Sequence, residues 1–246
     1  ILHINLEQSL VDAPSKNPMG SFDFITMTST SQLTIYDALR ALESAANDER
    51  IEGIYINYTG GGTASLTLLE ELRAAIINFK KSGKWVVAYN DVYSQWMYYL
   101  CSVADKIYIQ PEGTFEWVGI QAQTLFFKGL LDKLGVKVDI LRPTVCKYKS
   151  AVEPYFLTQM SDANRQQMQE MVDNMWGVLT DAVSASRGIE KAELNRLADE
   201  LAVMLPEEAV ANKLIDGVKY ADQMEELFEA EYGIEDVEYI TLGEYV

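Results

Sequence analysis

Residues 51–89 have the sequence IEGIYINYTGGGTASLTLLEELRAAIINFKKSGKWVVAY. Residues 51–57 form a short run rich in β-branched side chains, which is typical of a strand. The glycines at 60–62 interrupt the chain, and residues 65–81 place leucines and isoleucine at helical spacing after a serine cap. Residues 85–89 form a second apolar strand. A strand, a helix and a second strand predict a parallel βαβ unit.

The same alternation continues on both sides of this stretch, and the end of the chain is mainly helical. We predict one domain over residues 1–246, with a poorly ordered loop at 12–31 that is rich in Ser, Thr, Pro and Gly. The predicted strands are 1–6, 106–109, 136–141 and 237–240. The predicted helices are 34–46, 95–104, 126–134 (ended by Gly135), 162–186, 191–199, 206–211 and 221–232.

Composition excludes several classes of protein. The 246 residues are 48% hydrophobic, so a sizeable core can form. A net charge of −17 argues against nucleic acid as a partner, because phosphate binding needs a basic face. No run approaches the roughly 20 apolar residues that span a bilayer. The chain begins with isoleucine, so we expect a part of a longer protein, with any signal peptide or membrane anchor upstream.

Candidate catalytic groups are few. A Ser–His–Asp or Cys–His triad would have to use His3, which lies inside the first predicted strand, where packing is the simpler role. The two cysteines, Cys101 and Cys146, lack the spacing of a zinc site, and we favour two buried thiols over a disulfide. Phosphate-binding loops and HExxH spacing are absent. We therefore expect no metal and no cofactor.

A lysine or carboxylate acting with a hydroxyl nucleophile remains, and the segment around Lys149 is the informative one. Two lysines after a strand are usually solvated. Here Tyr148, Val152, Tyr155 and Phe156 could partly desolvate an ammonium group. Lowering a lysine pKa from about 10.4 to about 7 costs roughly 4 kcal/mol, which an apolar pocket can supply. A lysine tuned in this way can take a proton from serine.

The segment 148–154, YKSAVEP, followed by Met160 and Ser161, resembles the catalytic-lysine segment of the signal peptide peptidase A (protease IV) family. Further matches to the N-terminal repeat of the long, two-repeat bacterial form of that family follow in order along nearly the whole chain. They are YDAL at 36–39, DERIEGI at 48–54, FKKSGK at 79–84, YSQ at 93–95, YYL at 98–100, ADKI at 104–107 and LDKLGV at 131–136.

The resemblance implies an α/β fold with a crotonase/ClpP-like twisted core of repeated ββα-type units, flanking helices and a helical C-terminal region. It implies a serine peptidase that degrades signal peptide remnants, with Lys149 as the general base of a Ser–Lys dyad. The serine is expected in a C-terminal repeat outside this chain, so the isolated fragment is expected to be inactive or nearly so. The resemblance also implies action on the extracytoplasmic side of the bacterial envelope and anchoring in the membrane. It further implies a homo-oligomer.

Other parts of the site are predicted from position. Ser94 occupies the place that corresponds to the nucleophile, but its bulky neighbours favour a helix N-cap. Gly61 and Gly62 resemble the turn that forms the oxyanion hole, although an ordinary strand-to-helix turn is the alternative. Ser150 could hold the Lys149 region in place. Glu153 would raise a nearby lysine pKa, so we expect it to brace the loop and face away.

Two other functions stay open. The first is an acyl-CoA enzyme of the crotonase class, because fold does not fix chemistry. The second is a non-catalytic module that assembles into a ring or bowl. Its apolar surface could come from the aromatic run at 96–99 or from methionines at helical spacing, although such methionines are more often core. The second set comprises Met168, Met171, Met175 and Trp176.

Overall fold

The computed structural model describes residues 1–6, 9–13, 22–23, 28–29, 33–58, 64–143 and 145–245. The chain divides into two compact units, one formed by Ile1–Val118 with Ala182–Val246 and the other by Gly119–Asp181. The single domain over residues 1–246 therefore stays a prediction. The loop predicted at 12–31 lies largely outside the described residues.

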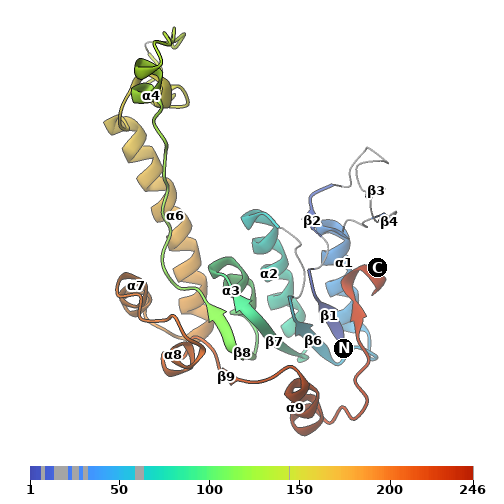
Figure 1. Cartoon of the computed structure of the whole chain (residues 1–246). Helices are drawn as coiled ribbons and strands as arrows, with labels where there is room; N and C mark the ends of the chain where they lie inside the picture. The colour runs from blue at the N-terminus through green and yellow to red at the C-terminus, as the bar shows by residue number, and fades with distance from the viewer. Residues whose placement is uncertain are drawn as a thin grey trace. The chain divides into compact units, whose positions relative to one another are not determined.

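The first unit is built on a six-stranded parallel sheet with the strand order β10-β1-β6-β7-β8-β9 (Figure 1). Strands β1, β6, β7 and β8 are neighbours in chain order, which is the arrangement that successive βαβ units produce. The predicted α/β fold is thus confirmed. The strands are β1 (Leu2–Ile4), β6 (Gly53–Ile56), β7 (Trp85–Tyr93), β8 (Lys106–Phe115), β9 (Gly217–Val218) and β10 (Ile240–Thr241). Two small pairs lie outside it, β2 (Leu10–Val11) with β5 (Leu33–Thr34) and β3 (Phe22–Asp23) with β4 (Thr28–Ser29).

Helices cover both faces of the sheet. Helices α1 (Ile35–Asn47), α2 (Leu66–Lys80) and α3 (Gln95–Cys101) lie side by side on one face, and α9 (Asp222–Tyr232) lies on the other (Figure 1). Each of the first three begins after a hydroxyl cap, because the side chains of Thr34, Ser65 and Ser94 accept from backbone N–H groups of the first turn. The remaining helices of this unit are α7 (Lys191–Asp199), α8 (Pro206–Ala211) and α10 (Leu242–Tyr245).

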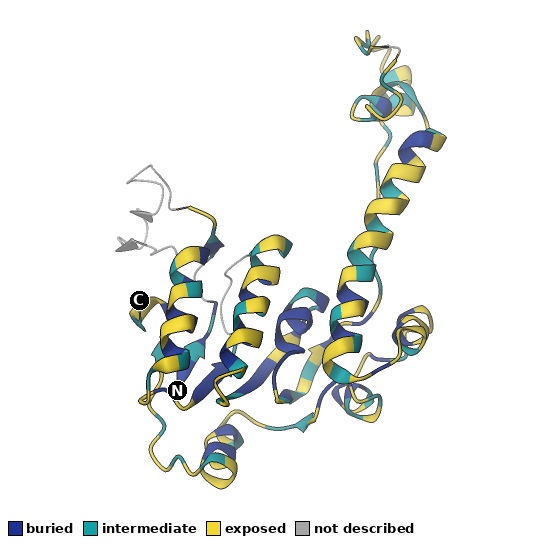
Figure 2. Cartoon of the chain, turned by 180° about the vertical axis from the view of Figure 1, so that it is seen from behind, coloured by how far each residue is buried: buried dark blue, intermediate teal, exposed yellow. Residues whose placement is uncertain are grey.

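Burial follows the periods of the elements. The outward faces of α1 and α2 are exposed and their inward faces buried (Figure 2). Val87 and Tyr89 of β7 pack with Phe228 of α9, so the alternate buried residues Val86 and Ala88 face the opposite side of the sheet. Both faces of β7 are therefore buried, as in other parallel sheets.

Gly53 is required by the packing of β6 against β7. It lies in register with Trp85, and a Cβ atom at position 53 would overlap the indole ring. The ring stacks on Tyr232 of α9, with 4.4 Å between ring centroids. The close approach of backbone to ring explains why a residue without a side chain stands in the strand.

Arg73 joins three elements of the first unit. From α2 its guanidinium donates to the Tyr99 carbonyl at 3.0 Å and to the Ala182 carbonyl at 3.1 Å. It also donates to the Ser186 hydroxyl at 2.6 Å. Residues 182–187 are the last part of α6 (Asp162–Arg187), so this arginine fixes the end of that helix against α2 and α3.

The second unit contains α4 (Lys128–Lys133), α5 (Glu153–Phe156) and the first part of α6. Helix α4 ends before Gly135, whose φ of +70° favours glycine. The predicted strand at 136–141 is wrong. Val136, Val138 and Leu141 are exposed, Leu141 at 97%, and no described strand lies beside this segment to pair with it. Alternation alone does not make a strand when no neighbour offers a hydrogen-bonding edge.

The aromatic run at 96–99 and the methionine set of α6, both considered above as assembly surfaces, differ in burial. Met97, Tyr98 and Tyr99 of α3 are core residues, so the run at 96–99 does not form an exposed surface. On α6, by contrast, Met171 is 45% exposed, and the other members of its set are half-buried. The expectation that this second set is core is therefore wrong for the described chain.

Candidate active site

The candidate general base, Lys149, lies in a turn of the second unit before α5. Its backbone N–H donates to the Cys146 carbonyl at 3.2 Å, and the carbonyl of Ser150 accepts from the Glu153 N–H at 2.9 Å. The segment lines an open hollow of about 390 Å³ together with Leu141 and Val152. Backbone hydrogen bonds therefore hold the lysine at the rim of a concave surface.

Arg142 connects this turn to the residues that follow it. Its Nη1 donates to the Lys149 carbonyl at 3.2 Å and lies 3.7 Å from Oε1 of Glu153. The guanidinium also lies over the Phe156 ring, 5.8 Å from the centroid. One arginine thus joins the Lys149 backbone to both ends of α5, which fixes the position from which the lysine side chain extends.

Glu153 braces the loop, as we expected from its place in the sequence. The side chain is 1% exposed, and its carboxylate accepts from the Ser161 hydroxyl at 2.6 Å and from the Asn164 amide at 3.1 Å. Burial tends to raise the pKa of Glu153, but the hydrogen bonds from Ser161 and Asn164 and the charge of Arg142 outweigh it and lower that pKa below its ordinary value. The carboxylate is therefore charged and engaged with partners other than Lys149.

The Lys149 side chain itself is exposed in this chain. No ion pair joins it to a carboxylate within the described ranges. The expected desolvation does not come from the chain alone, because Tyr148 is 51% exposed and Tyr155 is 47% exposed. That part of the sequence interpretation needs correction: the flanking aromatic side chains leave the amine open to solvent. The neighbouring Lys147 differs, since its ammonium lies 5.3 Å from the centroid of the Tyr148 ring.

Ser94 is the N-cap of α3, as its neighbours favoured. Its hydroxyl accepts from the Met97 N–H at 3.3 Å, and its side chain is half-buried. The preceding Tyr93 is fully buried and donates to the Tyr108 carbonyl at 3.1 Å, so no small residue exposes the serine on that side. Ser94 belongs to the first unit and Lys149 to the second.

The remaining predicted site residues have different outcomes. Gly61 and Gly62 lie outside the described residues, so the oxyanion turn stays a prediction. Ser150 is half-buried beside Lys149, and its backbone carbonyl accepts from the Glu153 N–H. A supporting role for its hydroxyl stays a prediction. Sequence reasoning missed Arg142 altogether. Its position seven residues before Lys149 gave no signal, because the described residues that join the two are neither helix nor strand and no period applies to them.

His3, Cys101 and Cys146 show no arrangement for catalysis. His3 stacks on Tyr55 with 5.5 Å between ring centroids, which is the packing role expected of it. Both cysteines are free thiols, Cys101 buried and Cys146 only half-buried, so burial was predicted correctly for the first alone. Burial raises the pKa of Cys101, which keeps the thiol protonated. Within the described ranges no group of three or more His, Cys, Asp or Glu side chains could hold a metal ion.

A parallel sheet covered by helices and a lysine on a braced turn define an α/β protein that could supply a base to a hydroxyl nucleophile. Residues 78–235 match the family described as peptidase family S49. The chain belongs to peptidase family S49, and its six-stranded parallel sheet agrees with the ClpP/crotonase type of fold.

Curated relatives agree with this family. The chain is 38% identical over 160 residues to Protease 4 of Haemophilus influenzae, covering 65% of this chain and 26% of the relative. It is 30% identical over 247 residues to Protease 4 of Salmonella typhi, covering 94% of this chain and 39% of the relative. It is 28% identical over 195 residues to the chloroplastic serine protease SPPA of Arabidopsis thaliana, covering 78% of this chain and 28% of the relative. The chain thus spans between about a quarter and two fifths of these relatives.

Proposed function

We propose that this chain is the lysine-bearing repeat of a serine peptidase, and that Lys149 is the general base of a Ser–Lys dyad. The observation that carries the proposal is the state of this lysine. Its backbone is held by Arg142, while its amine is exposed at the rim of a hollow without a described carboxylate partner. An unpaired amine on a braced backbone is available to a group brought by another part of the parent protein.

The nucleophile is proposed to be a serine outside residues 1–246, in a second repeat. In support, the hydroxyl of Ser94 already accepts the hydrogen bond that caps α3. When the second repeat covers the hollow, water leaves the surroundings of Lys149 and the uncharged amine is favoured. The amine then takes the proton of the serine hydroxyl, the oxygen attacks the peptide carbonyl, and the lysine returns the proton to the leaving amine.

The proposed substrates are cleaved signal peptides, and the proposed place of action is the extracytoplasmic side of the bacterial inner membrane. These proposals rest on the family resemblance. In the part of the chain that the structure describes, no helix has the length and apolar character that crossing a membrane requires.

The test compares the full-length protein with its Lys149→Ala and Lys147→Ala variants on a fluorogenic peptide. We expect Lys149→Ala to lower kcat by about a hundredfold or more, as removal of a general base does. Lys147→Ala removes an equal charge two residues away and should keep nearly full activity. Normal activity in a folded Lys149→Ala variant would overturn the proposal.

An assembly role is the second candidate, and it is compatible with the first. The second unit exposes apolar side chains that would be covered in an oligomer or by a second repeat. The most exposed are Leu141 at 97%, Val145 at 88%, Leu134 at 67% and Leu125 at 66%. Sedimentation of the full-length protein tests it: Leu141→Ser with Val145→Ser should reduce the assembled fraction, and an unchanged fraction would contradict it. The acyl-CoA alternative has no supporting observation here.

A further inference from the structure

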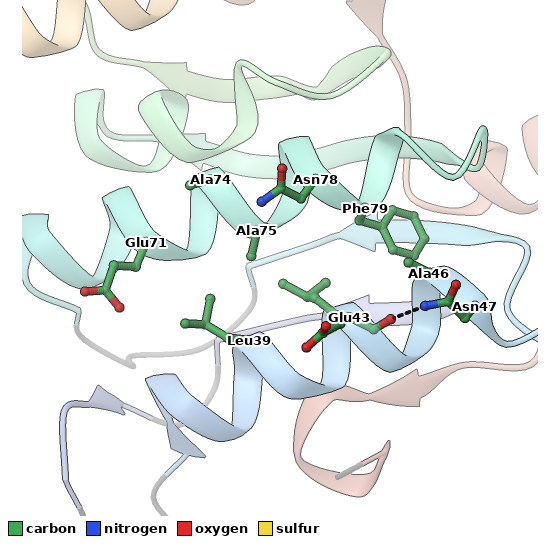
Figure 3. A pocket seen from close by; sticks show the side chains of 10 residues that line it. Leu39, Glu43, Ala46, Asn47, Glu71, Ala74, Ala75, Asn78 and Phe79 are labelled. Atoms are coloured by element: carbon green, nitrogen blue, oxygen red, sulfur yellow. Dashed lines mark hydrogen bonds between the residues drawn. The ribbon is translucent and has the colours of Figure 1, made fainter.

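A groove of about 620 Å³ lies between α1 and α2 in the first unit (Figure 3). The two helices face each other through small side chains, Ala46 of α1 and Ala74 and Ala75 of α2. Each alanine leaves space that a larger residue would fill. The floor is apolar, because Leu42 and Phe79 lie there and are each 1% exposed.

The edges of the groove are acidic. Glu43 of α1 and Glu71 of α2 line it from opposite sides, and both are exposed. Figure 3 shows the side chains of Glu71 and Ala75 directed from α2 toward α1. None of the described residues that line the groove is basic, and neither carboxylate forms an ion pair with a described residue.

These features suit an apolar helix with a cationic end. Apolar side chains spaced three and four residues apart can enter a groove between two helices. Lysines at the end of such a segment can reach carboxylates on either edge. The volume lies within the range of pockets that take small ligands and side-chain anchors. A second copy of this chain fits less well, because it would bring a net charge of −17 toward the same carboxylates.

We propose that the groove between α1 and α2 binds the apolar segment of a cleaved signal peptide, with the basic end of that peptide beside Glu43 and Glu71. The choice of peptide rests on the proposed function, since signal peptides combine a basic end with an apolar run. Binding in the groove would raise the local concentration of the peptide at the protein.

The test measures binding of a fluorescein-labelled peptide with two lysines followed by about ten leucines and alanines. The full-length Lys149→Ala variant serves as the parent, so that the peptide is not cleaved. At low salt, adding Glu43→Gln with Glu71→Gln should weaken binding about five- to tenfold, because exposed charge pairs are individually weak. Adding Ala74→Lys, at an exposed position, should weaken binding at least as much, because the new side chain fills the groove and its positive charge repels the lysines of the peptide.

The matched control is Glu70→Gln, which removes an exposed carboxylate of α2 that does not line the groove and should leave binding unchanged. A peptide with two glutamates in place of its lysines should bind the parent more weakly than the basic one. Equal binding of both peptides, or full binding by Ala74→Lys, would overturn the proposal. Self-association of the parent that Ala74→Lys abolishes, without peptide binding, would overturn it in favour of a second copy.

The same proteins separate this proposal from the one on which it rests. If Lys149→Ala abolishes peptidase activity but Ala74→Lys leaves peptide binding intact, only the groove proposal fails. If Lys149→Ala retains activity while the binding measured before cleavage still depends on Ala74 and the two glutamates, the groove proposal stands as a binding site and the dyad fails.

Discussion

Arg142 donates a hydrogen bond from Nη1 to the carbonyl oxygen of Lys149 at 3.2 Å. The same nitrogen lies 3.7 Å from the buried carboxylate of Glu153. The lysine that we propose as the base is thus attached to a fixed charge pair through its main chain, while its amine stays unpaired. Arg142 and Glu153 therefore hold the loop in place, and the amine of Lys149 stays available for proton transfer.

Replacing Arg142 with alanine should impair catalysis without unfolding the protein. The Lys149 carbonyl loses its donor, and a displaced base costs rate steeply, so we expect kcat of the full-length protein to fall about ten- to a hundredfold with little change in KM. Arg165→Ala is the control, because Arg165 is exposed on α6 of the same unit. Parental kcat in a folded Arg142→Ala variant would show that the tie to Lys149 is unimportant.

The charge of Glu153 should make stability depend on acid pH. Its pKa in the folded protein is lowered below the ordinary 4.5. The stabilisation is therefore fully present above about pH 4.5 and is lost as the pH falls through the folded pKa. Near neutral pH, Glu153→Gln should lower the free energy of unfolding of the second unit by about 2 kcal/mol.

Thermal melts of the parent and Glu153→Gln between neutral and acid pH measure this effect. The difference between the two melting temperatures should shrink as the pH falls below about 4.5. Glu170→Gln, which changes an exposed carboxylate of α6, should follow the parent throughout. A difference that is independent of pH would mean that the charge of Glu153 contributes nothing.

Gly53→Ala should destabilise the first unit. The added methyl group overlaps the Trp85 ring, which would have to leave its stack on Tyr232, so we expect a loss of about 1 to 3 kcal/mol. Gly129→Ala is a control with the opposite sign, because the space around Gly129 in α4 is open and alanine favours a helix by about 0.5 to 1 kcal/mol. Chemical denaturation followed by tryptophan fluorescence measures both. Equal stability of Gly53→Ala and the parent would contradict the packing described here.

Much of the first unit could be predicted because its signals are local. The β-branched run at 53–56 and the caps Ser65 and Ser94 need no distant partner to be recognised. Strand β9 has only two residues, Gly217 and Val218, and its pairing with β8 is long-range, so no period in the sequence marked it.

The sequence motif selects Lys149 as the candidate base, and that assignment stays a prediction, but the motif did not predict what surrounds this residue. The exposure of its side chain depends on how the surrounding turn folds, which the motif does not encode. The strand predicted at residues 136–141 was wrong because their alternation fits a strand but the described chain supplies no partner strand. Arg142 could not be found, since only the turn brings it to the Lys149 carbonyl.

In the mechanism proposed above, the base and the nucleophile come from different parts of the parent protein. The most direct measurement is labelling with a serine-directed fluorophosphonate, followed by mapping of the modified residue by mass spectrometry. We predict that the full-length protein is labelled at a serine outside residues 1–246, and that Lys149→Ala slows this labelling at least a hundredfold. A folded chain of residues 1–246 should stay unlabelled. Labelling of that chain at Ser94 would contradict the account.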